Sequence, residues 1–183
     1  MQGRDSRPLG NRVAARRSSG ALDAQMILLR PSTREELELF VEFEAEEDTC
    51  KFINQNSLAE HSRWFDDDRI RYLTILKDDK AVGFFILCLE DGAVEFRRVV
   101  VAASSRGIGQ DAIRSMHSFC VHELGVSRIW LDVYEHNERG RHIYSKLGYK
   151  VTGSAEHDGK RLLVMEKRIQ QYNAADAIGA ADF

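Results

Sequence analysis

The stretch from Val99 to Gln110 constrains the fold of this chain most, because an apolar strand pattern runs there directly into a glycine-containing turn and an amphipathic helix. Its sequence is Val99-Val100-Val101-Ala102-Ala103-Ser104-Ser105-Arg106-Gly107-Ile108-Gly109-Gln110. Residues without bulky side chains let backbone N–H groups approach a phosphate, and the positive end of the helix dipole adds attraction. The turn is therefore either an anion-binding site or a tight packing contact between strand and helix.

This turn differs from the two common nucleotide-binding turns. Ala112 stands where a dinucleotide-binding turn has its third glycine, and no Gly-Lys-Ser or Gly-Lys-Thr follows as it would in a P-loop. The sequence therefore disfavours dinucleotide binding and nucleotide hydrolysis.

Hydrophobic periodicity predicts strands and helices on both sides of the turn. Apolar strands are predicted at residues 26–31, 71–76, 81–89, 93–102, 128–133, 149–152 and 161–166. Helices with one apolar face are predicted at residues 33–43, 57–67, 107–125 and 138–147. The first helix is opened by Ser32 or Thr33 and the third is closed by Gly125. A strand–helix–strand crossover from Glu95 to Val133 within this order predicts a mixed α/β sheet.

The composition predicts one globular domain between two irregular ends. The chain has 183 residues, of which 43% are hydrophobic and 30% charged, and no apolar run is long enough to span a membrane. Residues 1–25 are rich in Arg, Ser, Gly and Ala without apolar periodicity, so we expect a disordered basic leader. The folded domain is expected at residues 26–170, followed by a flexible tail at residues 171–183. Whether the leader is native stays open, because Met26 could also begin the protein.

Charge and cysteine content exclude several classes of partner. The chain has 26 Lys and Arg against 29 Asp and Glu, a formal net charge of −3. The leader holds five Arg and two Asp, which sum to +3, so the remainder carries about −6 and direct nucleic-acid binding is disfavoured. Cys50, Cys88 and Cys120 are an odd number at wide spacing, so we expect reduced thiols, no metal site and a cytoplasmic protein.

Two motifs resemble the signatures of the GNAT superfamily of N-acyltransferases. The run from Ser104 to Gly109 resembles its acyl-CoA pyrophosphate loop, Gln/Arg-x-x-Gly-x-Gly/Ala, although Ser104 stands where Gln or Arg is usual. The run from Trp130 to Tyr149 is similar to its second signature, a strand and an Asn-headed helix that contains a Tyr and closes on Leu-Gly-Tyr. The resemblance covers about residues 27–168. It implies a mixed, mostly antiparallel twisted sheet of about seven strands flanked by four helices, with a splayed strand pair at the acyl-CoA site.

The resemblance also implies acetyl-CoA as co-substrate and indicates the residues that would bind it. The peptide groups of Val99 and Val101 would pair with the pantetheine arm, as the equivalent strand does in this family. The pyrophosphate would accept hydrogen bonds from the backbone N–H groups of Arg106, Gly107, Ile108, Gly109 and Gln110, and the Arg106 side chain would add charge. Asn137 would contact the cofactor arm, or it would serve only as the N-cap of its helix.

Two residues are implied in the chemistry. Tyr144 matches the Tyr that protonates the departing thiolate in many members, unless it is only a buried aromatic side chain. Glu95 matches a catalytic base that acts directly or through water, and strict alternation would put it on the face of Val99 and Val101. The alternative for Glu95 is an ion pair with Arg97 or its neighbour Arg98.

The acceptor is recognised in this family largely by the first two helices and their connecting loop, here residues 34–68. This region contains the carboxylates Glu35, Glu36, Glu38, Glu42, Glu44, Glu46, Glu47, Asp48, Glu60, Asp66, Asp67 and Asp68. Negative charge around a cleft would concentrate a cationic acceptor such as a primary amine. The alternative is a solvated helix face without a role in binding.

These observations predict an acetyl-CoA-dependent N-acetyltransferase that acts on a primary amine of a small molecule or peptide, by direct attack in a ternary complex. The alternative from another class is a CoA-binding regulatory or sensor domain of the same fold without transfer activity. Transfer to oxygen, or of a longer acyl group, stays open. A homodimer also stays open, with edge pairing through residues 161–166 as one route.

Overall fold

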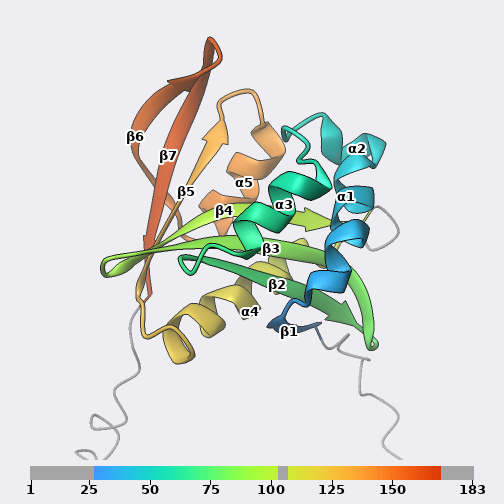
Figure 1. Cartoon of the computed structure of the whole chain (residues 1–183). Coiled ribbons are helices and arrows are strands. Elements are labelled where there is room, and N and C mark those ends of the chain that lie inside the picture. The colour runs from blue at the N-terminus through green and yellow to red at the C-terminus, as the bar shows by residue number, and fades with distance from the viewer. Residues whose placement is uncertain (1–26, 103–106, 170–183) are drawn as a thin grey trace, which may run out of the picture.

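The residues that the computed structural model describes, 27–102 and 107–169, contain seven strands that form one twisted sheet (Figure 1). The strands are β1 (Ile27–Pro31), β2 (Ile70–Lys77), β3 (Lys80–Glu90), β4 (Ala93–Val101), β5 (Arg128–Tyr134), β6 (Lys150–His157) and β7 (Lys160–Arg168). Their order in the sheet is β1-β2-β3-β4-β5-β7-β6, and every neighbouring pair is antiparallel except β4 and β5. The predicted mixed, mostly antiparallel sheet is therefore confirmed.

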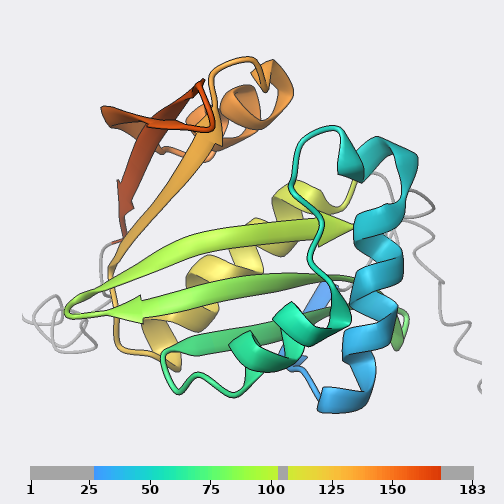
Figure 2. The same ribbon diagram turned by 45° about the horizontal axis from the view of Figure 1, so that its top comes forward.

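The same described ranges contain five α-helices and one 3₁₀ turn. They are η1 (Arg34–Glu36), α1 (Leu37–Ala45), α2 (Glu47–Cys50), α3 (Leu58–Phe65), α4 (Gly109–His122) and α5 (Glu138–Lys146). Four of these α-helices match the predicted ones, while α2 is a single turn that the sequence pattern did not predict. Helices α1 and α3 lie over one face of β2, β3 and β4, and α4 lies over the opposite face (Figure 2). No described helix is long and apolar enough to cross a membrane.

Short polar interactions set the helix ends. The backbone N–H of Thr33 donates to the Glu36 carboxylate over 2.8 Å, as the predicted capping box requires. Helix α4 is followed by Gly125 in the left-handed region, with φ of +66°, and the N–H of Val126 donates to the carbonyl of Cys120 over 2.9 Å. Both predicted helix boundaries are therefore confirmed. The expected basic leader and the C-terminal tail lie outside the described residues.

Each face of the sheet carries its own apolar core. Between the sheet and α1 the core centres on Phe40, which is 0% exposed and stacks on Phe84 at 4.3 Å between ring centroids. On the opposite face, α4 contributes Ile113 and Met116 to a core shared with residues of β3, β4, β5 and β7. The two cores fix β4 from both sides, which positions the strand that borders the site.

A bulge in β4 changes which side chains share a face. Arg98 pairs with Ile86 of β3, but the next pair is Phe96 with Leu87, so Arg97 is the extra residue. A bulge lets two successive side chains point to the same side. Arg97 and Arg98 both turn toward the helices α1 and α3, since Arg97 lies over the Trp64 ring and Arg98 binds Glu44.

The bulge overturns the expectation that Glu95 shares a face with Val99 and Val101. Before the bulge, Phe96 packs into the α4-side core and Glu95 points to the opposite face, across from Cys88. After the bulge, Val99 and Val101 pack against the α4-side core. Regular alternation would have been needed to keep Glu95 with the valines, and one inserted residue reverses it.

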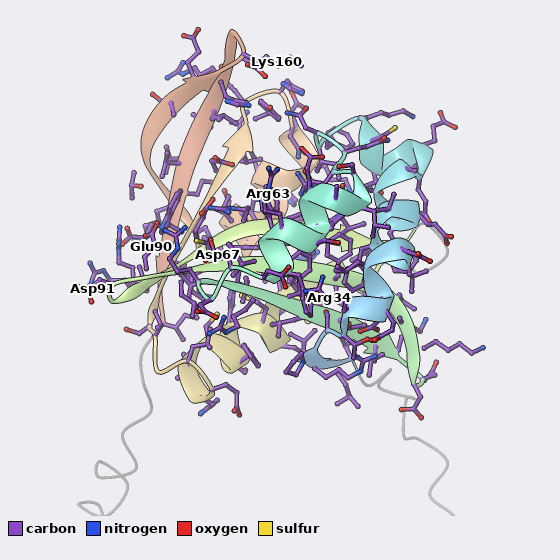
Figure 3. The ribbon with its side chains drawn as sticks, in the orientation of Figure 1. Arg34, Arg63, Asp67, Glu90, Asp91 and Lys160 are labelled. Carbon is purple, nitrogen blue, oxygen red and sulfur yellow. The ribbon has the colours of Figure 1, made fainter. Side chains whose placement is uncertain are left out.

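Strands β4 and β5 pair at only two positions and then diverge. The paired residues are Val94 with Ile129 and Glu95 with Trp130. The indole N–H of Trp130 donates to Glu90, labelled in Figure 3, over 2.9 Å, which ties β5 to the end of β3 at the closed end of the splay. From residue 96 onward β4 has no strand partner on this side among the described residues. The predicted splayed pair is therefore confirmed (Figure 2).

Strand β6, and not β7, forms the sheet edge beyond β5. Strand β7 lies between β5 and β6, so residues 161–166 are not available for the edge pairing that the sequence suggested. All eight residues of β6 are exposed, and the hairpin projects from the sheet with Lys160 at its tip (Figure 3). An edge contact between copies would therefore involve β6.

The Phe40 stack gives a direct test of the α1-side core. Replacing Phe40 by Ala removes a fully buried ring and leaves a cavity, so the free energy of unfolding should fall by about 3–5 kcal/mol. Phe40→Leu keeps most of the volume and should cost less. Urea denaturation followed by circular dichroism measures both, and equal stability of Phe40→Ala and the parent protein would contradict this account of the core.

Candidate active site

A cleft with a volume of about 590 Å³ opens where β4 and β5 diverge. Its walls come from the free edge of β4, the facing part of β5, the first turns of α4 and α5, the segment 48–54 and the end of β6. One cleft therefore joins the glycine turn to the two strands that carry Glu95 and the polar residues of β5.

The glycine turn forms one end of the cleft. Gly107 has a φ of +97°, and no atom lies within 4 Å of the position that a Cβ would take at Gly107 or Gly109. Helix α4 begins at Gly109, so its first backbone N–H groups, including that of Gln110, have no intrahelical acceptor. Open space beside N–H groups that have no intrahelical acceptor fits a pyrophosphate.

The other residues predicted to bind the donor lie on β4 and around the turn. The side chain of Ile108 is buried in the α4-side core, so only its backbone could serve a ligand. Val99 and Val101 line the cleft on the unpaired edge of β4, where a peptide-like ligand could add hydrogen bonds. Arg106 lies outside the described residues.

Asn137 caps helix α5 and also lines the cleft. Its side-chain Oδ1 accepts a hydrogen bond from the backbone N–H of Gly140 over 2.9 Å. A Cβ at position 140 would come within 2.8–3.0 Å of the Asn137 amide, so the glycine leaves room for the cap. The N-cap interpretation is confirmed, and contact with a cofactor arm stays a prediction.

Tyr144 lines the cleft beside two other aromatic rings. Its ring meets Phe96 and Tyr149 edge-to-face, each at 5.9 Å between centroids. Burial, and then the nearby charge of Asp132, raise the pKa of Tyr144 to about 12. The hydroxyl therefore stays protonated at neutral pH.

Glu95 is held by an arginine in the cleft. The Arg97 guanidinium donates three hydrogen bonds to the Glu95 carboxylate at 2.6–3.2 Å, and it lies 5.5 Å from the centre of the Trp64 ring. The ion pair between Glu95 and Arg97, which the sequence offered as the alternative to catalysis, is therefore present. It does not remove Glu95 from the site, since both residues line the cleft.

Asp132, which was not predicted from the sequence, faces Glu95 across the splay. The Asp132 carboxylate is accessible through the open cleft, but protein surrounds it on the other sides. This partial burial raises the pKa of Asp132, and the negative charge of Glu95 raises it further. Asp132 makes no ion pair with another described residue. A single carboxylate within the apolar strand Ile129-Trp130-Leu131-Asp132-Val133 was the available signal. Glu156 of β6 adds a further carboxylate to the same wall.

The acidic helices, by contrast, mostly turn away from the cleft. Of the 12 carboxylates at residues 34–68, only Asp48 lines it. Others are engaged elsewhere: Glu36 with Arg30, Glu44 with Arg98, Glu47 with Lys51, Glu60 with Ser57, Asp66 with Arg34 and Asp67 with Arg69. The carboxylates that line the cleft therefore come chiefly from β4, β5 and β6, and Arg97, Arg98 and Arg139 line it as well. Within the described residues, no group of His, Cys, Asp and Glu side chains is arranged to hold a metal ion.

Similar solved structures share this fold at low sequence identity. The aminoglycoside acetyltransferase AAC(6')-Ib in complex with coenzyme A superposes with a TM-score of 0.69 at 15% identity, covering 80% of this chain and 97% of that one. A spermidine N-acetyltransferase of Vibrio cholerae in complex with CoA and spermine gives 0.67 at 16% identity, with the same coverage. The likeness supports the architecture of sheet and helices described above.

Sequence comparison shows the family. An N-acetyltransferase of Mycobacterium bovis, described as uncharacterised, is 29% identical over 132 residues, which cover 67% of this chain and 84% of the relative. The sequence profile of the family described as "Acetyltransferase (GNAT) domain" matches residues 26–150, more than half of the chain, and includes the splayed strands and the glycine turn. The protein therefore belongs to the GNAT acetyltransferase family and is an acyltransferase.

Proposed function

We propose that this protein transfers an acetyl group from acetyl-CoA, the co-substrate of its family, to a primary amine of a small molecule or peptide. Transfer occurs by direct attack in a ternary complex. The observation that carries the proposal is the single cleft, which joins a glycine-lined helix start to a wall of carboxylates on β4, β5 and β6.

The donor would lie along the free edge of β4. The N–H groups at the start of α4, beside Gly107 and Gly109, would hold the pyrophosphate, and the backbone of Val99 and Val101 would pair with the pantetheine arm. By the family resemblance, Arg106, Ile108, Gln110 and Asn137 belong to the same binding surface. Acetyl-CoA supplies an activated thioester.

The chemistry requires one group that accepts a proton and one that donates a proton. Glu95 takes the proton of the attacking amine, directly or through water, while the Arg97 guanidinium holds the carboxylate in place. The Tyr144 hydroxyl gives its proton to the departing thiolate as the new C–N bond replaces the C–S bond. Both residues line the cleft where β4 and β5 diverge.

The acceptor would be a cationic amine. Asp132 and Glu156 form no ion pair with other described residues, so their charge faces the cleft and attracts an ammonium group. The exposed ring of Phe52 and the side chain of Ile53 supply apolar surface opposite. Two similar structures carry names of enzymes for amines, an aminoglycoside and spermidine, which is consistent with this class.

We also propose a cytoplasmic protein that forms a homodimer. The three cysteines carry free thiols, and Cys88 and Cys120 are buried, as is common in reducing compartments. Strand β6 is exposed along its whole length and has no strand partner on its outer edge within residues 27–102 and 107–169, which suits pairing between two copies.

The glycine turn predicts a selective loss of donor binding. Gly107→Trp places a large side chain at a position with φ of +97° in the proposed cradle, so the Kd for acetyl-CoA should rise by about tenfold or more. Gly92→Trp is the matched control, because Gly92 also has a positive φ of +70° and open surroundings but lies in the β3–β4 turn. Calorimetric titration with acetyl-CoA measures both variants, and unchanged binding by Gly107→Trp would remove the turn from the site.

The protonated Tyr144 predicts a loss of turnover without a loss of donor binding. With a pKa near 12 the hydroxyl keeps its proton at an assay pH of about 8, and Tyr144→Phe deletes this acid, so kcat should fall by about 100-fold. The Kd for acetyl-CoA should change by less than about threefold, because the ring remains. Tyr149→Phe, which removes a hydroxyl bonded to His117 over 2.8 Å, is the control and should lower stability more than turnover.

Thiol release measured with spermidine, an aminoglycoside, a dipeptide and an alcohol then decides the class of reaction. Release with amines alone supports N-acetyl transfer, and release with the alcohol supports transfer to oxygen. Acetyl-CoA binding without release from any acceptor would favour the regulatory or sensor domain instead. A parallel series with longer acyl-CoA donors defines the chain preference.

A further inference from the structure

The wall of the cleft opposite β5 is formed by a short segment between α1 and α3. The residues of this segment that line the cleft are Asp48, Thr49, Phe52, Ile53 and Asn54, and we call them the acceptor wall. Apart from α2, a single turn, the segment has no regular structure, and Phe52 exposes a large apolar ring. Its position therefore depends on contacts with the rest of the domain.

We propose that Glu44, through its buried ion pair with Arg98, positions the acceptor wall for catalysis. This inference rests on the proposed acetyl transfer and adds a residue that does not touch either substrate. Glu44 is 0% exposed and does not line the cleft, so it acts through other groups.

Glu44 and Arg98 supply the hydrogen bonds that hold the second half of this segment. The N–H of Asn56 donates to Glu44 Oε2 over 2.7 Å, and Gln55 Nε2 donates to the Glu44 carbonyl over 3.4 Å. Arg98 Nη2 donates to the carbonyl of Asn54 over 2.9 Å. Among the described residues, these are the hydrogen bonds that tie residues 51–56 to α1 or to the sheet.

The pair itself is well built for a fixed geometry. Arg98 Nη1 lies 2.5 Å from Glu44 Oε1, and the buried His61 ring lies 3.4 Å from the same oxygen. Burial alone would raise the pKa of Glu44, but the nearby His61 ring, the charge of Arg98 and the Asn56 N–H together lower it, so the carboxylate stays charged. A buried ion pair adds little net stability compared with packed apolar side chains of the same volume. Holding the attached segment in a fixed position therefore explains the Glu44–Arg98 ion pair better than a contribution to stability does.

The bulge in β4 connects this pair to the catalytic group. Because Arg97 and Arg98 point to the same face, one arginine holds Glu95 while the next holds the acceptor wall. The two attachments are on adjacent residues of a strand fixed by both cores. A movement of Asn54 relative to Glu95 would therefore require breaking the Arg98–Asn54 hydrogen bond or bending β4.

The same helical layer offers a matched control. Glu36, at the start of α1, binds Arg30 over 2.8 Å, the N–H of Thr33 over 2.8 Å and the hydroxyl of Thr74 over 3.0 Å. It therefore also fastens this layer to the sheet through an ion pair and further hydrogen bonds. It has no hydrogen bond to residues 51–56 and does not line the cleft.

The experiment compares Glu44→Gln with Glu36→Gln in the full-length chain. Each change removes the charge and keeps the shape. In Glu44→Gln, amide hydrogen exchange at residues 51–56 should accelerate by about tenfold, because a neutral amide oxygen accepts a weaker hydrogen bond from the Asn56 N–H than the carboxylate does. The acceptor KM should rise by about fivefold or more, while the Kd for acetyl-CoA stays within about twofold, since the donor end of the cleft is untouched. Glu36→Gln should lower the melting temperature but change neither the exchange at residues 51–56 nor the acceptor KM.

A second variant covers the case in which Glu44→Gln does not fold. Arg98→Lys keeps the positive charge but loses the planar guanidinium that reaches Glu44 and the Asn54 carbonyl at once, so it should give the same exchange and KM pattern. Unchanged exchange at residues 51–56, an unchanged acceptor KM, or equal effects of Glu44→Gln and Glu36→Gln would each overturn the proposal. A parent protein that transfers acetyl to no acceptor would instead refute the proposed function, and this inference with it.

Discussion

The separation of β4 from β5 is the constraint on which the rest of the site depends. A parallel pair that holds together at only two positions leaves a row of backbone groups on β4 without a strand partner. Such groups are costly to bury unpaired, so they must face water or a ligand that forms hydrogen bonds. The two cores keep the strand in this arrangement, because residues of β4 pack against α1 on one face and α4 on the other. The packing of the domain therefore maintains an open edge that an extended ligand can complete.

One extra residue in β4 then distributes the functional groups between the two faces. Without the bulge at Arg97, Glu95 and Arg98 would lie on opposite faces, and the base and the acceptor wall would have no common support. With it, the peptide edge and the Val99 and Val101 side chains belong to the donor side, while Glu95, Arg97 and Arg98 point toward α1 and α3. In the proposed ternary complex, donor and acceptor would thus meet along a single strand from different sides.

Local sequence signals predicted the parts of the structure that local interactions determine. The strand–turn–helix at Gly107 and the cap at Gly125 could be identified because their residue types satisfy the backbone within a few positions. The bulge could not, since the residues from Glu95 to Val101 are compatible with regular alternation and the extra residue is defined only by pairing with β3. Asp132 was missed for the same reason: its importance comes from Glu95 on a neighbouring strand, far away in sequence.

The acidic run of the first helices illustrates the limit of charge patterns. Twelve carboxylates at residues 34–68 suggested a binding surface, yet six of them, none of which lines the cleft, cap helices or pair with arginines and lysines. The charge that faces the cleft lies mainly on strands, which a packed sheet holds rigidly, and the apolar wall lies on an irregular segment held by one buried ion pair. In the proposed complex, attraction of a cation and selection of its shape would depend on different elements. Changes in the segment 48–54 would alter which amine fits, whereas the preference for a positive charge would persist as long as Asp132 and Glu156 keep their places in the sheet.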